Sequence, residues 1–430
     1  MTEPAQVAKR APSERLVTVV GQGYVGLPLS VAVASAGHRV QAVEADPYRI
    51  GLLRQRTSYI VDVSDAELSE VDRTGAFRPF GSVAETEPAD VFVIAVATPV
   101  TEAGEPDLHQ VDRAVTDIAP ELRPGALVIV ESTVYPGATR QRVAPMLERL
   151  SGLEAGLDLH VAYSPQRIDP GRAESARRIP KLLAGLDEHA ALAATDFYKN
   201  VYDQVVTVSS CEVAEFAKLY ENTFRYLNVA FANELAKAAH AMGIDFREVS
   251  RAAATKPFGF MQFSHGPGVG GHCLPNNVYY LSHALAQIGA GSTLLEAAVQ
   301  INDSMPRYTV ERLRTLLTKR GKSIDGASVL LLGLSYKAGV ADTRNSPSFP
   351  IAELISAAGG KVRIADPHVA QEVDSEHFTL VELTEAECRN SDAVLLATDH
   401  PDLDHDMIVA NSPVLLDCRG GLSSPLAERL

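Results

Sequence analysis

One cysteine follows the densest run of glycines in the chain. The segment GPGVGGHC begins at Gly266 and ends at Cys273. Glycines permit backbone conformations that other residues avoid, and they let a ligand approach the main chain closely. A cysteine at the end of such a loop, at the start of a helix, would be activated as a nucleophile. A lone cysteine is otherwise usually a small buried residue, but the glycines favour the nucleophile. The adjacent His272 could tune the thiol or simply pack in the loop.

Two polar residues lie four positions apart in a long stretch that is rich in helix formers. Lys218 and Asn222 fall within 211–241, where proline and glycine are nearly absent. This composition predicts an unusually long helix, with both residues on one face. From such a face they could orient a hydroxyl group and its oxyanion, although surface residues show the same spacing.

A glycine-rich turn follows the first apolar run, 16–20. The segment GQGYVG begins at Gly21, and Glu44 stands at the end of the next strand-like run. Strand, glycine turn, helix and distal acid together are typical of a dinucleotide site. Glu44 would accept hydrogen bonds from ribose hydroxyls and repel a 2′-phosphate, which favours NAD over NADP. Asp46 competes for this contact, but the following Pro47 favours a turn.

Strand-like runs alternate with helical stretches in both halves of the chain. Continuous apolar strands of this kind predict parallel sheets covered on both faces. We therefore expect an α/β protein with two Rossmann-like, doubly wound parallel-sheet domains joined by the long helix. The predicted strands are 16–20, 39–45, 91–97 and 126–130 in the first half, and 327–332, 362–365, 393–398 and 413–417 in the second.

The turn in the second half, which begins at Gly333, lacks the second and third glycines. A complete dinucleotide is not expected there. A nucleotide could bind by other means, with Lys337 and Arg344 as phosphate partners. Solvated surface charge explains these two residues equally well.

Composition excludes several functional classes. A net charge of −15 without any basic stretch speaks against nucleic acid as a partner. No apolar run approaches the length of a membrane span, and the polar residues 1–15 lack a signal-peptide core, so we expect a disordered tail on a cytoplasmic protein. Four cysteines without a CxxC pair do not suggest a disulfide framework, and no metal site is expected.

Several longer segments extend these motifs. They are GQGYVGLPLS from Gly21, TPVTEAGEPDL from Thr98, ESTVYPGATR from Glu131, EFAKLYENTFRYLNVAFANEL from Glu215, GPGVGGHC from Gly266, INDSMP from Ile301 and LGLSYKAGVADTRNSP from Leu332. In these segments the chain resembles the UDP-glucose/GDP-mannose dehydrogenase family, and the resemblance covers nearly its whole length. Three further segments are similar to the UDP-N-acetylglucosamine 6-dehydrogenase branch, namely YSPQRIDPG from Tyr163, IPKLLAG from Ile179 and TKPFGFMQF from Thr255.

The resemblance implies a division of the chain and a reaction. Residues 16–208 would bind NAD, 209–310 would form a central helical region with the dimer interface and the cysteine loop, and 311–430 would hold a nucleotide sugar. We therefore expect a homodimer or a larger homo-oligomer. The implied reaction is a two-step oxidation of the C6 alcohol to a carboxylate.

The resemblance also assigns roles to individual residues. Lys218 and Asn222 would steady the C6 oxygen, Cys273 would capture the aldehyde as a thiohemiacetal, and Thr133 would help to place water. Arg344 could reach a neighbouring subunit. Further cofactor contacts would come from Gly21, Gly23, Tyr24, Val25, Gly26, Glu44, Arg49, Thr98, Pro99, Glu131 and Ser132, and further substrate contacts from Arg167, Lys181, Lys256, Phe258, Phe260, Phe263, Gly270, Lys337 and Arg344.

Two positions depart from the family pattern, and both bear on the chemistry. Gln166 stands where the family has a glutamate that acts as the base for thioester hydrolysis, and an amide cannot take that proton. Asn277 replaces an aspartate that holds a water and balances Lys218. Both changes keep the shape of the side chain and remove its charge.

These departures leave three functions to distinguish. The primary prediction is an NAD-dependent nucleotide-sugar 6-dehydrogenase whose hydrolytic step is in question. A redox-neutral epimerase would oxidise the sugar transiently, invert a neighbouring carbon and return the hydride, so it would release no NADH. A non-catalytic binding protein would have no use for Cys273, Lys218 and Asn222, which argues against it.

Overall fold

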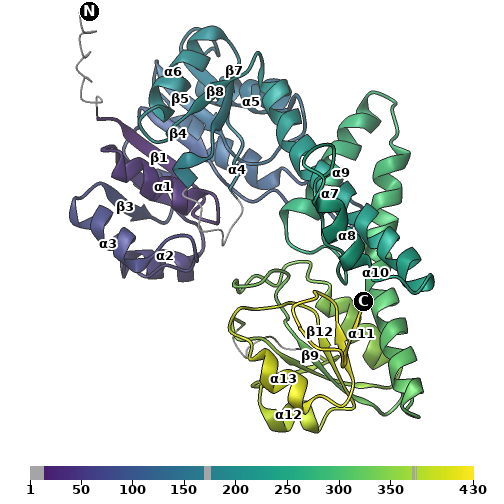
Figure 1. The fold of residues 1–430 in the computed structure, drawn as a ribbon. Coiled ribbons are helices and arrows are strands. Elements are labelled where there is room, and N and C mark those ends of the chain that lie inside the picture. Colours follow the sequence, from purple (N-terminus) through teal and green to yellow (C-terminus); the bar gives the residue numbers. More distant parts are fainter. Residues whose placement is uncertain (1–13, 169–175, 370–372, 374) are drawn as a thin grey trace, which may run out of the picture. The chain divides into compact units, whose positions relative to one another are not determined.

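The computed structural model describes residues 14–168, 176–369, 373 and 375–430. The chain divides into two compact units, Met1–Tyr220 and Glu221–Leu430, each built on its own sheet (Figure 1). Helix α7 (Cys211–Ala241) begins in the first unit and ends in the second, and it confirms the predicted long helix. Most of the predicted tail, 1–15, lies outside the described residues. The finer division at 208 and 310 stays a prediction.

The first unit contains an eight-stranded sheet in the order β3-β2-β1-β4-β5-β6-β7-β8. All neighbouring strands are parallel except β6 and β7, which are antiparallel. Strands β1, β2, β4 and β5 confirm the four predicted runs. The strands are β1 (Leu16–Val20), β2 (Arg39–Val43), β3 (Phe77–Phe80), β4 (Val91–Ile94), β5 (Ala126–Val130), β6 (Leu159–Tyr163), β7 (Lys181–Gly185) and β8 (Val205–Thr207).

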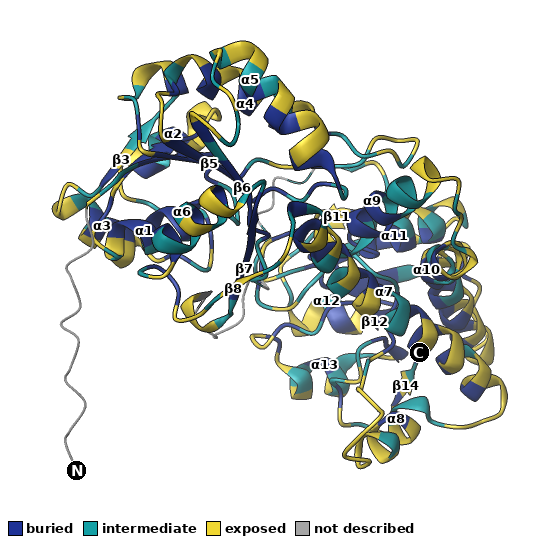
Figure 2. Cartoon of the chain, turned by 90° about the horizontal axis from the view of Figure 1, so that it is seen from above, coloured by how far each residue is buried: buried dark blue, intermediate teal, exposed yellow. Residues whose placement is uncertain are grey.

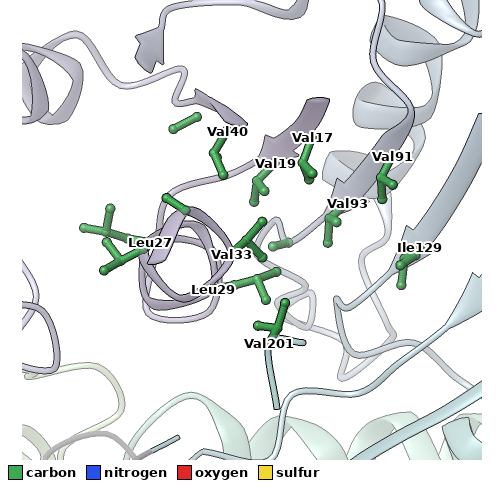
Figure 3. Close-up of a cluster of buried hydrophobic side chains, with 14 of the residues drawn as sticks. Val17, Val19, Leu27, Leu29, Val33, Val40, Val91, Val93, Ile129 and Val201 are labelled. Carbon is green, nitrogen blue, oxygen red and sulfur yellow. The ribbon is translucent and has the colours of Figure 1, made fainter. Parts of the chain in front are cut away.

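Helices cover this sheet on both faces, which explains why its strands are apolar on both sides. In Figure 3, Val17 and Val19 of β1 point toward Val33 and Leu29 of α1, and all four side chains are buried. Figure 2 shows β5 and β6 buried and the outer surfaces of α4 and α5 exposed. The helices are α1 (Gly26–Ser35), α2 (Pro47–Arg54), α3 (Asp65–Arg73), α4 (His109–Ile118), the π-helix Thr139–Val143, α5 (Ala144–Ser151) and α6 (Glu188–Tyr198).

The second unit contains a six-stranded parallel sheet in the order β11-β10-β9-β12-β13-β14. This order repeats that of the first six strands in the other unit, so the predicted pair of Rossmann-like domains is confirmed. The strands are β9 (Ser328–Leu332), β10 (Lys361–Ala365), β11 (Thr379–Leu380), β12 (Ala393–Leu396), β13 (Leu415–Asp417) and β14 (Ala427–Arg429).

The second unit also holds a group of helices beside its sheet (Figure 1). The longest is α10 (Thr293–Lys319), which continues through Pro306 and packs against α11. Helix α10 was not predicted from the sequence. The remaining helices are α8 (Phe246–Ala254), α9 (Cys273–Gln287), α11 (Ser348–Ala357), α12 (Glu385–Arg389) and α13 (His405–Asn411).

Candidate active site

The glycine turn after β1 is shaped by close main-chain approaches. Gly21 has φ +92°, which favours glycine, and its N–H donates to the carbonyl oxygen of Val43 at 2.9 Å. A Cβ atom added at Gly26 would lie 1.8 Å from the carbonyl oxygen of Gly21, whereas one added at Gly23 would meet nothing within 4 Å. The first and third glycines therefore serve the turn, and the second leaves room for a ligand against the main chain.

Glu44 follows β2 and braces this turn. One of its carboxylate oxygens accepts from the Gln22 N–H at 3.2 Å, and the other accepts from the Asp46 N–H at 2.9 Å. Asp46 caps α2, where its side chain accepts from the N–H of Tyr48 at 2.8 Å. This cap gives Asp46 the turn role that Pro47 suggested and leaves Glu44 as the acid beside the glycine turn.

Arg49 on α2 contacts a residue that the sequence analysis missed. Its guanidinium lies 5.3 Å from the centre of the Tyr59 ring, and the Tyr59 hydroxyl donates to the carbonyl oxygen of Gln22 at 2.7 Å. Burial and the nearby Glu44 carboxylate raise the pKa of Tyr59, so its hydroxyl stays protonated. Tyr59 thereby fastens the segment after α2 to the glycine turn. No local motif marks this tyrosine.

The remaining cofactor candidates follow the central strands of the same sheet. Thr98 and Pro99 come after β4. Ser132 is the second residue after β5, and its hydroxyl donates to the carbonyl oxygen of Val96 at 2.8 Å. Because β1, β4 and β5 are parallel neighbours, their carboxyl ends meet at one edge of the sheet. Open α/β sheets bind their ligands at this edge. Tyr24 and Val25 are partly buried at the start of α1.

Glu131 and Lys181 are paired with each other. The Lys181 ammonium lies 2.7 Å from a carboxylate oxygen of Glu131, and the Tyr198 hydroxyl donates to the same oxygen. The ammonium also lies over the rings of Tyr198 and Tyr202, at 4.9 and 5.1 Å from their centres. Burial lowers the pKa of Lys181, and the Glu131 charge opposes that effect. These two candidate ligand contacts thus form a buried ion pair under the sheet edge.

Gln166 follows β6, and its carboxamide orientation is set by the main chain. Its side-chain oxygen accepts from the N–H groups of Arg167 and Ile168 at 2.7 and 3.2 Å. Its side-chain nitrogen is buried. This nitrogen stands where the second carboxylate oxygen of a glutamate would be. The Arg167 guanidinium donates to the carbonyl oxygen of Pro180 at 3.0 Å.

A buried glutamate on α7 holds the loop after Thr133. Glu215 accepts from the N–H of Gly137 at 2.6 Å and from that of Thr139 at 3.0 Å. Burial raises the pKa of Glu215, and these hydrogen bonds oppose that rise. No role was predicted for Glu215 from the sequence, although an acidic residue on the buried face of a helix indicates a specific partner. Lys218, one turn further along α7, is buried too.

In the second unit, Cys273 is the first residue of α9 and its side chain is exposed. One turn later, the buried Asn277 accepts a hydrogen bond from the side-chain nitrogen of Asn222 at 2.9 Å. This bond joins α9 to α7. Burial and the Arg344 charge lower the pKa of His272, so that imidazole is neutral at pH 7.

The aromatic substrate candidates lie on the segment after α8. The Lys256 ammonium is 5.0 Å from the centre of the Phe258 ring, and Phe258 and Phe260 are exposed. Phe263 instead packs edge-on against Phe224, with 5.9 Å between ring centres. The structure thus joins Lys256 to one of its aromatic neighbours and places Phe263 against α7.

The second glycine turn differs from the first in what occupies its N–H groups. Asp366, which follows β10, accepts from the main-chain N–H of Leu334 and Ser335 at 2.8 Å each. These two N–H groups are therefore already engaged within the protein. Arg344 makes a bidentate salt bridge with Asp342. Its Nε donates to Oδ1 at 2.9 Å and its Nη2 donates to Oδ2 at 2.5 Å, and the arginine side chain remains about half exposed. Lys337 is partly buried on the same loop.

Two further properties concern the described residues as a whole. None of their helices is both long and apolar enough to cross a membrane. They also contain no group of three or more histidine, cysteine or acidic side chains placed to hold a metal ion.

Three parts of the chain match one protein family. Residues 15–206 match the NAD binding domain of the UDP-glucose/GDP-mannose dehydrogenase family, 212–304 its central domain and 330–424 its UDP binding domain. The match over 330–424 supports binding of a nucleotide sugar by the second sheet domain.

Individual relatives agree with this match over almost the full length. The chain is 36% identical to the UDP-N-acetyl-D-mannosamine dehydrogenase of Pyrococcus horikoshii over 90% of each chain. It is also 36% identical to the UDP-N-acetyl-D-glucosamine 6-dehydrogenase of Pseudomonas aeruginosa, over 89% of this chain and 90% of the relative. The structure of a UDP-D-ManNAc dehydrogenase from P. horikoshii superposes with a TM-score of 0.88 at 33% identity, covering 96% and 98% of the two chains. The chain therefore belongs to the UDP-glucose/GDP-mannose dehydrogenase family and is an NAD-dependent oxidoreductase.

Proposed function

We propose that the chain oxidises C6 of a nucleotide-activated hexose that resembles UDP-N-acetylglucosamine or UDP-glucose. The names of the relatives from P. aeruginosa and P. horikoshii support an N-acetylated hexose. The observation that carries the proposal is the exposed Cys273 at the start of α9, directly after the glycine loop. The other three cysteines, Cys211, Cys388 and Cys418, are buried.

The first sheet domain fits the cofactor. The open space at Gly23 admits a pyrophosphate, and the Glu44 carboxylate next to the turn suits ribose hydroxyls. When bound, NAD accepts one hydride in each of two oxidations. We assign cofactor contacts to the sheet edge that carries Thr98 and Ser132.

Cys273 would carry the covalent chemistry. Lys218 and Asn222 hold the C6 oxygen while the alcohol loses a hydride and a proton. The Cys273 thiolate then bonds to the aldehyde carbon, and the resulting thiohemiacetal loses a second hydride to become a thioester. Water, placed with help from Thr133, breaks the carbon–sulfur bond and releases the acid. That last step needs a proton acceptor, which the amide of Gln166 cannot be.

A redox-neutral epimerase is the second candidate, and the amides at 166 and 277 favour it specifically. A carbonyl acidifies the hydrogen on the neighbouring carbon, so inversion there followed by return of the hydride requires no hydrolytic base. The dehydrogenase takes first place because Cys273 is exposed and because the named relatives are dehydrogenases.

A panel of nucleotide sugars with NAD tests both functions. NADH together with a carboxylate product supports the dehydrogenase, and its loss in Cys273→Ser supports the thioester route. An isomeric product without NADH supports the epimerase. If nucleotide sugars bind but none is converted, the chain is a non-catalytic binding protein.

We also propose that the chain forms a homodimer or larger assembly in the cytoplasm. Large apolar side chains are exposed along α7, including Phe216, Tyr220, Phe224 and Phe231. An exposed apolar stripe of this kind is typical of an interface. Four cysteines without a disulfide suit a reducing compartment.

A further inference from the structure

We propose that Asn345 is a positioning residue that couples nucleotide binding on the loop 333–347 to the reactivity of Cys273. The inference rests on the proposed nucleotide site, which includes Lys337 and Arg344. It concerns contacts within the second unit only. These contacts join the loop that follows β9 to the glycine loop that precedes α9.

Gly271, two residues before Cys273, is held by this loop on both sides. Its N–H donates to the carbonyl oxygen of Arg344 at 2.9 Å, and its own carbonyl oxygen accepts from the side-chain nitrogen of Asn345 at 3.1 Å. The peptide groups on each side of Gly271 are therefore hydrogen-bonded to residues 344 and 345. A shift of that segment must move the residues leading into α9.

The glycine loop 266–272 packs closely against the loop 333–347. A Cβ atom added at Gly270 would lie 2.6 Å from Cβ of Tyr336, and one added at Gly271 would lie 2.7 Å from the Tyr336 ring. At Gly268, it would lie 3.0 Å from Cβ of Pro347. Groups packed this closely cannot slide past one another without a wider rearrangement.

Asn345 has a backbone conformation that few residues adopt. Its φ is +50°, in the left-handed region, where asparagine is tolerated better than most residues. Such a conformation persists only when its surroundings hold it. The Asp342–Arg344 pair and the bond from Asn345 to Gly271 supply those surroundings. A phosphate that draws Arg344 away from Asp342 would therefore act directly on the residue that holds Gly271.

The other end of the glycine loop is anchored elsewhere. The Gly266 N–H donates to the side-chain oxygen of the buried Asn233 on α7 at 3.0 Å. Asn233 in turn donates to the side chain of the buried Asn302 on α10 at 2.9 Å. With Gly266 fixed to two helices, movement at 344–345 is taken up between Gly268 and Cys273.

The test measures alkylation of Cys273 by iodoacetamide, with UDP as the probe. Peptide mass spectrometry follows Cys273, and the buried Cys211, Cys388 and Cys418 serve as internal references. Saturating UDP should raise the rate at Cys273 by about fivefold, the low end of ordinary coupling between sites. Simple shielding by UDP would lower the rate instead. An unchanged or lower rate at saturation overturns the proposal.

Two variants isolate the side-chain contact. Asn345→Gly keeps the positive φ and removes the amide, and Asn345→Asp keeps the shape and removes the donor. Both should bind UDP within about threefold of the native chain and lose the UDP effect on alkylation, whereas Asn411→Asp on α13 should retain it. If either Asn345 variant keeps the effect, or if UDP affinity itself collapses, Asn345 does not act as proposed. The readout requires no turnover, so it stands even if Cys273→Ser disproves the thioester route.

Discussion

The ammonium group of Lys181 lies 2.7 Å from the carboxylate of Glu131, and both side chains are almost fully buried. Lys181 is the first residue of β7 and Glu131 follows β5, so the pair connects the antiparallel extension of the sheet to its parallel part. Taking two charges out of water is costly, and the pair persists because each charge neutralises the other.

The first prediction concerns this pair. Lys181→Met should destabilise the chain by about 3–5 kcal/mol, because it leaves the Glu131 charge buried and unpaired. Lys181→Met combined with Glu131→Gln should recover most of that loss. Urea unfolding followed by circular dichroism measures both. The exposed pair Lys199–Asp196 gives the control, since Lys199→Met should cost about 1 kcal/mol or less. If the single and double variants lose the same free energy of unfolding, an unpaired Glu131 charge is not the cause of the destabilisation.

The second prediction concerns cofactor choice. NADP should bind at least about 100-fold more weakly than NAD, because its 2′-phosphate would meet the Glu44 carboxylate. Glu44→Gln removes the charge and keeps one of the two acceptor oxygens, so it should narrow the ratio of the two dissociation constants. Asp46→Asn, which preserves the cap of α2, should leave the ratio unchanged. Calorimetry measures the dissociation constants of NAD and NADP for the native chain and for both variants. Comparable values for the two cofactors in the native chain would contradict the role of Glu44.

The third prediction concerns assembly. Light scattering at micromolar concentration should give at least twice the chain mass of 46.1 kDa. Phe231→Glu places a charge on the exposed apolar stripe of α7 and should lower the measured mass. Leu192→Glu, at a residue equally exposed on α6, should not. A native chain that scatters as a monomer would refute the dimer.

The fourth prediction concerns pH and His265. Burial, helped by the charge of Arg247, lowers the pKa of His265 from 6.5 to about 4. Between pH 6.5 and 4, His265 binds a proton in the unfolded chain but not in the folded chain. The free energy of unfolding should therefore fall as the pH falls from 6.5 toward 4. The loss from this group amounts to at most about 3 kcal/mol.

His265→Gln removes this titration and keeps a donor for the main-chain oxygen of Leu430, which His265 contacts at 3.1 Å. Urea midpoints of this variant should therefore change less with pH over the same range. The exposed His189→Gln should follow the native curve. If both variants lose stability as steeply as the native chain, His265 is not the group responsible.

Local sequence patterns were sufficient to predict the strands and helices that are marked by an uninterrupted run of similar residues. The apolar runs at 16–20 and 126–130 predicted β1 and β5 because strands covered on both faces need apolar side chains throughout. The stretch 211–241 predicted α7 because nothing in it interrupts a helix. Strand β7 was missed, since it opens with a lysine whose partner, Glu131, lies fifty positions earlier.

Residues of the candidate site were likewise predicted only where a local sequence pattern marks them. Cys273 and Glu44 were identified because glycine-rich turns mark them in the sequence. Tyr59 and Asn345 were missed because their roles depend on contacts with Gln22 and Gly271, which are distant along the chain. Such contacts arise only when the folded chain brings separate loops together.

The last prediction concerns the two amides. Both can be changed to acids without loss of the bonds that hold them. A glutamate at 166 could accept from the N–H groups of Arg167 and Ile168 with one oxygen and leave the other for water. An aspartate at 277 could accept from Asn222 as Asn277 does.

The native chain, by contrast, has no base at position 166. If Cys273 forms the thioester, hydrolysis should be slowed by about a hundred- to ten-thousand-fold, the usual effect of losing a general base. Rapid mixing with NAD and the preferred sugar should then show an early burst of NADH, and intact-protein mass spectrometry should show the acyl adduct. Gln166→Glu with Asn277→Asp should abolish the burst and raise steady acid production, whereas the exposed Gln110→Glu should do neither. Brisk acid production by the native chain without a burst would mean that another group activates water. If neither burst nor adduct forms and Cys273→Ser leaves product formation unchanged, the thioester route is not used, and the redox-neutral epimerase becomes the better description, because it needs no base at 166.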